Sequence, residues 1–446
     1  MKFLPAAGCG PLAVLAALSL AAFPAPARAQ IEVVITQGVE KGVPVAVVPF
    51  GWSGKSGAAA PPVNVSGVIS DNLRGSGRFE LALREDFLDF PHNHDQVKFS
   101  DWSQIGVDHL VIGNVHQLGE GRYRVRFQLF DVHRRGQIAA IQFIVPQSRL
   151  RRSAHKISDI IFEKLTGIRG AFDTRIAFVS VAAPGAEQRY ALNIADYDGR
   201  NAQTVFRSSE PVLSPVWSPD GEQLAYVTFE KRHSVVYIQH LKNGTRRKLP
   251  GHPGLNSAPA WSADGRRMAL SLSRDGNPEI YVHDFASGDL RRLTRHTAID
   301  TEPAWSPDGR HIVFTSNRSG SPQIYRISAS GRGRPQRLTF EGSYNAGAVY
   351  APDGGSLALV SNVDGEHRVG VLFLDSDGIF TLSDTRLDES PAFAPNGEAI
   401  LYATKTGPNS ILASVSKDGR TKKLITRQDG GASVDLREPA WSPFNR

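Results

Sequence analysis

Short, mostly apolar runs separated by turns that contain Gly, Pro, Asp or Asn recur through the last 60% of the chain, as at 224–228, 268–271, 312–315 and 357–360, and they are typical of β-strands. In residues 217–445 an aromatic residue followed by a Ser-Pro-Asp-Gly-like segment recurs six times, every 43 to 48 positions: Trp217, Trp261, Trp305, Tyr350, Phe393 and Trp441. Proline presets φ inside such a turn and glycine suits its last position, so each motif predicts a turn between antiparallel strands. Four short strands per repeat predict a β-propeller blade.

The two ends of this repeat array predict a closed ring. Strand-like runs at 175–179, 190–194 and 203–206 have no motif before them, and the last motif, at Trp441, has no further strands behind it. A strand around 439–441 can complete the blade that begins at Arg175, which also removes exposed sheet edges. We therefore expect an all-β six-bladed propeller over residues 171–446, closed by its C-terminal strand. We expect the motif aromatics to pack between neighbouring blades rather than to form a ligand-binding ring.

Residues 30–170 follow another pattern and predict a small mixed α/β domain. Strands are expected at 44–49, 109–112, 123–129 and 138–145, with helices at 63–73 and 150–165. Asn64 or Ser66 is a suitable N-cap for the first helix. Apolar residues at alternate positions indicate a half-buried sheet face: Tyr123, Val125, Phe127 and Leu129. The pattern does not define the strand order.

The first 29 residues resemble a secretory signal peptide. Lys2 precedes an apolar run at 12–23, and the small residues around Ala29 predict cleavage between Ala29 and Gln30. The apolar run is too short to span a bilayer comfortably. The only cysteine, Cys9, lies in this segment, so the mature chain would have no disulfide or thiolate chemistry.

The remaining composition gives little sign of catalysis or of nucleic-acid binding. The formal net charge is +7, but the basic residues are scattered, and no RNP or zinc-knuckle pattern occurs. A Gly-x-Ser-x-Gly nucleophile motif is absent. We expect no catalytic residue, no cofactor, no metal and no nucleic-acid partner.

One pattern supports an enzyme as the alternative function of this protein. Nine residues before four motif aromatics stand His252, His296, Glu341 and Asp384, and equivalent positions in a ring face one side, where they could converge on a metal. The first and last blades carry Ser208 and Ala432 there, which favours ordinary loop residues. A metal-dependent propeller enzyme, lyase-like or peptidase-like, is therefore the second hypothesis. The segment from Asp196 to Gly199 resembles a calcium loop, but a hairpin turn is the better interpretation.

Acidic residues precede several motif aromatics by three or four positions. Thr301, Glu302, Glu389 and Glu438 occupy these positions, with Asp388 and Arg437 beside them. We expect them in loops that lead into the inner strands, near the channel mouth. An acidic mouth could attract a basic segment of a partner or a cation.

Three segments resemble the TolB family, the periplasmic propellers of the bacterial Tol-Pal system. They are residues 162–178, the Asp-Tyr-Asp-Gly segment at 196–199, and the opening at 31–38 together with Val-Val-Pro-Phe at 47–50. The resemblance implies a periplasmic protein that does not span the membrane. It implies binding of the peptidoglycan-associated lipoprotein Pal on one propeller face, and of the inner-membrane protein TolA through the mature N-terminus. It further implies a role in outer-membrane integrity and cell division, with attachment to the outer membrane only through a partner.

The resemblance and the acidic mouth together indicate candidate binding residues. For Pal these are Leu255, Asn256, Ser257, Ala258, Thr301, Glu302, Asp388, Glu389, Arg437 and Glu438. For TolA they are Ile31, Glu32, Val33, Val34, Ile35 and Thr36. The second segment can form a strand, which could add to the sheet edge of a partner or dock on its own domain. Those two states could form a switch that binding at the propeller biases.

Overall fold

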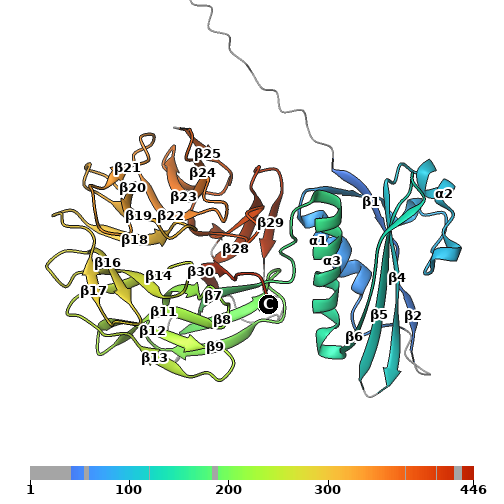
Figure 1. The fold of residues 1–446 in the computed structure, drawn as a ribbon, viewed down its shortest axis with the longest axis horizontal. Helices are drawn as coiled ribbons and strands as arrows, with labels where there is room; N and C mark the ends of the chain where they lie inside the picture. Colours follow the sequence, from blue (N-terminus) through green and yellow to red (C-terminus); the bar gives the residue numbers. More distant parts are fainter. Residues whose placement is uncertain are drawn as a thin grey trace, which may run out of the picture. The chain divides into compact units, whose positions relative to one another are not determined.

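The computed structural model describes residues 42–54, 60–119, 121–182, 189–376, 378–407, 409–425 and 434–445. The expected signal peptide with its cleavage site, the segment from Ile31 to Thr36, and Ala432 lie outside these ranges. The fold class agrees with the prediction, because a six-bladed β-propeller follows a smaller domain of mixed strands and helices (Figure 1).

One sheet forms the basis of the N-terminal domain, with the strand order β3-β1-β4-β5-β6 and with β2 pairing to β4. Its strands are β1 (Val43–Val47), β2 (Gly51–Ser53), β3 (Phe79–Leu81), β4 (His109–Gly119), β5 (Arg122–Asp131) and β6 (Gly136–Pro146). β1 pairs in parallel with β3 and β4, whereas β4, β5 and β6 form an antiparallel meander. The parallel pairing of β1 and β3 requires a crossover, which a helix provides.

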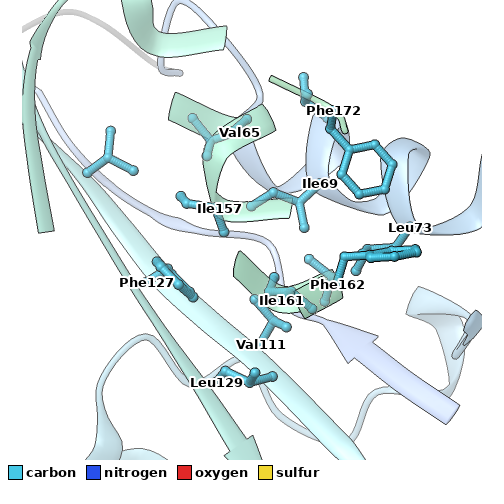
Figure 2. Packing of buried hydrophobic residues seen from close by; sticks show 14 of the residues in the cluster. Val65, Ile69, Leu73, Val111, Phe127, Leu129, Ile157, Ile161, Phe162 and Phe172 are labelled. Atoms are coloured by element: carbon cyan, nitrogen blue, oxygen red, sulfur yellow. The ribbon is translucent and has the colours of Figure 1, made fainter. Parts of the chain in front are cut away.

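That helix, α1 (Val65–Gly75), packs with α3 (Leu150–Thr166) against one face of the sheet. Asn64 caps α1, because its side-chain oxygen accepts a hydrogen bond from the Gly67 amide at 3.0 Å. The alternating apolar face of β5 is buried as predicted. Figure 2 shows this core between the helices and the sheet, with labelled side chains Val65, Ile69, Leu73, Val111, Phe127, Leu129, Ile157, Ile161, Phe162 and Phe172.

The opposite face of the sheet is partly covered by the short helix α2 (Phe99–Gln104). Trp102 of α2 packs there against Leu110 and Ile112 of β4 and Phe130 of β5. Three single-turn helices complete the domain: η1 (Arg84–Asp86), η2 (His94–Gln96) and η3 (Gln147–Arg149). None of the described helices has the length and apolar character needed to cross a membrane.

Each propeller blade is a four-stranded antiparallel sheet (Figure 1). The blade nearest the N-terminal domain in sequence contains β30 (Asp435–Trp441), β7 (Arg175–Val181), β8 (Tyr190–Asp196) and β9 (Gln203–Ser208). The next three contain β10 (Leu213–Trp217), β11 (Gln223–Glu230), β12 (His233–His240) and β13 (Arg246–Lys248); β14 (Asn256–Trp261), β15 (Arg267–Leu272), β16 (Glu279–Asp284) and β17 (Leu290–Arg292); and β18 (Asp300–Trp305), β19 (His311–Ser316), β20 (Gln323–Ser328) and β21 (Gln336–Arg337). The last two contain β22 (Asn345–Tyr350), β23 (Ser356–Val363), β24 (Glu366–Phe373) and β25 (Ile379–Thr381); and β26 (Asp388–Phe393), β27 (Ala399–Thr406), β28 (Asn409–Ser416) and β29 (Lys422–Ile425).

The Ser-Pro-Asp-Gly motif forms the predicted turn between the first and second strands of a blade. In the turn from β10 to β11, the Gly221 amide donates to the Ser218 carbonyl at 2.9 Å, and Gly221 has a φ of +72°. The Ser218 hydroxyl also accepts from the Gln223 amide at 2.9 Å. A glycine is required here because this φ is unfavourable for other residues.

The ring closes through β30, as the sequence predicts. This strand pairs antiparallel with β7, from Asp435 opposite Val181 to Trp441 opposite Ile176. Beyond it, the Ser442 amide donates to the Arg175 carbonyl at 2.8 Å. The chain's tail therefore supplies the first strand of the first blade.

Motif aromatics pack between blades, which confirms their predicted structural role. Trp217 and Trp305 are 5% and 8% exposed. Their indole N–H groups donate to first-strand carbonyls of the preceding blade, Trp217 to Ala440 at 3.2 Å and Trp305 to Ala260 at 3.1 Å. The indoles of Trp217 and Trp305 thus each join two adjacent blades.

A polar junction connects α1 and α3 with the first blade. The segment from Asp196 to Gly199 is a hairpin turn, as predicted, and it carries Tyr197. The Tyr197 hydroxyl donates to Asn72 Oδ1 at 2.7 Å, and Arg151 of α3 pairs with Asp198. Since α1 and α3 also form the N-terminal core, this junction couples the packing of both domains.

Candidate protein-docking face at the mouth of the propeller channel

The first strand of every blade contains a β-bulge at an equivalent position. The pairing with the second strand shifts in register there, as between Thr301 and Ala304 of β18. The bulge residues have positive φ angles: Ser214 (48°), Ala258 (47°), Glu302 (54°), Gly347 (64°), Ser390 (54°) and Glu438 (52°). This conformation costs a non-glycine residue about 1 kcal/mol or more. Bulges redirect side chains, and these six residues line one cavity along the propeller channel.

Carboxylates enter this channel from three blades. Glu302 and Glu438 are bulge residues, and Glu389 precedes a bulge. Glu302 Oε2 accepts from the Gly347 amide at 3.0 Å, and Glu438 Oε2 accepts from the Ser214 amide at 3.3 Å. Burial, with the negative charges of Glu389 and Glu302, raises the pKa of Glu438 to about 7. The Glu438 side chain therefore changes charge near neutral pH, while its backbone position stays fixed by the strand.

Apolar side chains surround the same end of the channel. We call Leu255, Ile299, Tyr344 and Leu387 the apolar rim; each directly precedes the first strand of its blade. Leu255, Ile299 and Leu387 are 36%, 48% and 49% exposed, and Tyr344 is partly buried. Exposed aliphatic side chains gathered on one face are typical of a protein-binding surface.

Buried polar residues hold the apolar rim in place. The residue after each rim position is Asn256, Asp300, Asn345 or Asp388, and all four are at most 3% exposed. Asp300 pairs with Arg318 at 2.6 Å, and Asn256 Nδ2 donates to the His252 carbonyl at 2.8 Å. Asn256 thus satisfies the backbone of its loop and Asp300 ties its loop to Arg318, while Leu255 and Ile299 beside them stay exposed.

The ten predicted Pal-binding residues divide into three groups by exposure. Leu255, Glu302, Glu389 and Arg437 are exposed, and Ser257, Ala258, Thr301 and Glu438 are partly buried. Asn256 and Asp388 are buried. Asn256 bonds to its own loop and to Ser234 of the preceding blade, and Asp388 accepts hydrogen bonds from Ser383 and from the Val369 amide of the preceding blade, so both support the surface rather than form it. The prediction that the acidic residues lie in loops is wrong, because Glu302, Glu389 and Glu438 lie within β18, β26 and β30, at or next to the bulges.

Three rim residues were missed by the sequence reasoning. Ile299, Tyr344 and Leu387 stand six residues before their motif aromatics, at the same spacing as Leu255. An apolar residue at that spacing, followed by Asn or Asp, was a signal available in four blades.

The alternative metal site is not assembled. His252, His296, Glu341 and Asp384 lie in loops of four different blades, where Asp384, for example, pairs with Lys422 at 2.8 Å. Within the described ranges, the single group of three or more potential ligands is His155, Asp196 and Asp198. The four loop residues therefore do not form a group that could hold one metal ion.

The group at His155 is a structural network of the domain junction. His155 is 2% exposed. Its Nδ1 lies 3.0 Å from the side-chain nitrogen of Asn72. When Nδ1 accepts this hydrogen bond, the ring proton of the neutral histidine is on Nε2. Arg151 already pairs with Asp198. Burial lowers the pKa of His155 to about 4. The neutral His155 and the arginine-paired Asp198 therefore link the two helices to the first blade.

Stability should depend on pH through Glu438. The folded protein holds this proton up to about pH 7, whereas an unfolded glutamate loses it near 4.5, so stability falls as pH rises between these values. Glu438→Gln should reduce this decrease in the free energy of unfolding and should raise that free energy at pH 8 by about 1 kcal/mol. Urea unfolding at pH 5 and pH 8 measures the effect, with Glu210→Gln on the exposed surface as control. An unchanged pH dependence in Glu438→Gln contradicts the assignment.

Known proteins resemble both parts of this chain. Residues 31–138 match the family model of the TolB amino-terminal domain, and residues 162–445 match that of the TolB beta propeller domain. The Tol-Pal system protein TolB of Nitrosococcus oceani is 52% identical over 417 residues, covering 93% of this chain and 94% of that protein. The same-named protein of Xanthomonas campestris pv. campestris is 49% identical over 439 residues, covering 97% and 98%. The crystal structure of TolB from Acinetobacter baumannii, 38% identical, covers 91% of this chain and 97% of its own with a TM-score of 0.80. With both domains matched and with relatives of this similarity along its length, the chain belongs to the TolB family of Tol-Pal system proteins.

Proposed function

We propose that this protein is a non-enzymatic periplasmic scaffold of the Tol-Pal system. It docks a peptidoglycan-associated lipoprotein of the Pal type on the channel-mouth face of the propeller. It binds a TolA-type inner-membrane protein through residues 31–36. In this role it attaches to the outer membrane only through its partner and supports outer-membrane integrity and cell division.

The observation that carries the first interaction is the apolar rim held by buried polar residues. Leu255, Ile299 and Leu387 are exposed, so their apolar side chains are available to a partner. Full burial of one such side chain by a partner contributes about 1.5–3 kcal/mol. Because the backbone that carries the rim is already ordered, binding of a partner costs little conformational entropy in this protein.

The acidic channel adds selectivity at the centre of this face. Glu302, Glu389 and Glu438 line the channel together with Tyr344 and Leu387 of the rim, and Arg437 is close to Glu389. Carboxylates at the centre of an interface favour a partner that presents basic or hydrogen-bond-donating groups there. The combination therefore favours a folded protein partner with apolar contacts outside and a polar contact inside.

The second interaction rests on sequence and family membership. Residues 31–36 alternate Ile31, Val33 and Ile35 with other residues, which suits a strand that adds to a partner's sheet edge. In that mode main-chain hydrogen bonds provide affinity, and alternate side chains provide specificity.

Charge placed on the apolar rim should weaken Pal binding. Leu255→Asp and Leu387→Asp should each lower the affinity for the soluble part of a purified Pal-type lipoprotein at least tenfold, because each buries an unpaired charge. Phe380→Asp is the matched control, since Phe380 is 56% exposed on the outer strand β25. Isothermal titration calorimetry gives the affinities. Equal losses in all three variants, or none in the rim variants, contradict the proposed face.

Removal of residues 30–36 should abolish binding to a TolA-type protein, because the strand-forming segment is lost. If the segment and the propeller face are coupled, the same deletion should also change the affinity for Pal, since coupling between two sites is reciprocal. Both affinities can be measured by calorimetry on the same preparation. Retained TolA binding contradicts the segment assignment, and an unchanged Pal affinity refutes the coupling.

A further inference from the structure

We propose that the edge strand β6 of the N-terminal domain is a second docking site, which accepts an extended segment of alternating apolar and acidic residues from a partner protein. The segment adds to the sheet as a new strand, and Arg124 and Arg126 of β5 bind its carboxylates. This site lies in a different domain from the channel-mouth face and does not depend on it.

β6 is a long strand with one open edge. It ends the sheet order β3-β1-β4-β5-β6, and its 11 residues extend about 35 Å. Its inner edge pairs with β5 along nearly its whole length, from Arg122 opposite Pro146 to Asp131 opposite Gly136. Between the strands that the structure describes, no backbone hydrogen bond reaches its outer edge. A row of amide and carbonyl groups is therefore available for another strand.

Apart from one register shift near its start, between Gln137 and Ala139, this edge lacks the usual protection against strand pairing. Natural edges are short, carry charges or proline, or are twisted away by bulges. β6 contains no charged residue, and its only proline, Pro146, is the last residue. Ile141 and Ile144 are 37% and 53% exposed. The opposite edge of the same sheet is β3, which has only three residues, so protection is missing from one edge only.

The charge beside this edge selects the partner. Arg124 and Arg126 pair with Ile144 and Gln142 across the strands, so all four side chains lie on the sheet face opposite the helices. Neither arginine makes an ion pair or a side-chain hydrogen bond within the described residues, and Arg124 Nε is buried without a partner. Adjacent strands are about 4.8 Å apart, so an arginine side chain can reach across β6. A carboxylate on the added strand would give these two arginine side chains an ion-pair partner.

The two faces of β6 together define the pattern of the segment. Ile141 lies on the helix-covered face, where it pairs with Phe127, and it favours an apolar neighbour on the added strand. The arginine face favours an acidic neighbour. Because successive side chains of a strand point to opposite faces, apolar and acidic residues should alternate in the docked segment.

A labelled nine-residue peptide of alternating Val and Glu tests the proposal with the mature chain, residues 30–446. We expect the peptide to bind and to slow hydrogen exchange in residues 136–146. A peptide with Lys in place of Glu, and a Val/Glu peptide N-methylated at alternate residues, should bind at least tenfold more weakly. The first tests charge selection, and the second tests backbone pairing. Equal binding of either control peptide overturns the proposal, as does absence of binding by the acidic peptide.

Matched protein variants locate the site. Arg124→Glu with Arg126→Glu should lower peptide affinity at least tenfold, whereas Arg84→Glu with Arg134→Glu, an equal charge change at other exposed positions, should change it less than twofold. Unaltered thermal unfolding shows that both variants fold. Binding that appears only after deletion of residues 30–41 assigns the edge to the chain's own segment and overturns the proposal. Protection of β6 that rises with protein concentration without peptide assigns the edge to a second copy and also overturns it.

Discussion

The antiparallel pairing of β30 with β7 is the interaction on which the propeller depends. A strand from the end of the sequence enters the first blade, so the ring is fastened by backbone hydrogen bonds between residues more than 250 positions apart. Without this pairing, β7 would present an open inner edge to the channel and the first and last blades would lose their shared packing. Closure is also what makes equivalent positions of the six blades point to one common face.

That common geometry turns small local features into a site. A bulge repeated in six strands directs Glu302 and Glu438 into the channel, and a buried Asn or Asp repeated in four blades keeps an apolar side chain exposed on the rim. No single blade provides enough surface to bind a protein. The ring places equivalent positions of the blades on one face. The residues at these positions differ between blades, and they provide the apolar and acidic groups of that face.

Much of the fold was predictable because its causes are local. The turn at Ser218 and Gly221 requires proline and glycine at fixed places, the Asn64 cap requires a short polar side chain, and the buried face of β5 requires alternation. The strand order of the N-terminal domain was not predictable, since the parallel pairing of β1 with β3 and β4 depends on contacts distant in sequence. At the site, the acidic residues were found from spacing, but the bulges that place them in strands depend on backbone angles that the residue types alone do not define. The burial of Asn256 and Asp388 likewise follows from loop hydrogen bonds that become visible only in the fold.

A disulfide across the closing pair measures ring closure most directly. The only cysteine of the chain is Cys9, inside the expected signal peptide, so two engineered cysteines in the mature protein have no native competitors. Val181 lies opposite Asp435 in the register of β7 and β30, and Val181→Cys with Asp435→Cys should form a disulfide in the folded protein, whereas Val181→Cys with Arg437→Cys, two residues out of register, should not. Mass spectrometry of the non-reduced protein shows whether each of the two cysteine pairs has formed a disulfide. Equal oxidation of the two pairs, or none in the first, would contradict the closed ring and the docking face that follows from it.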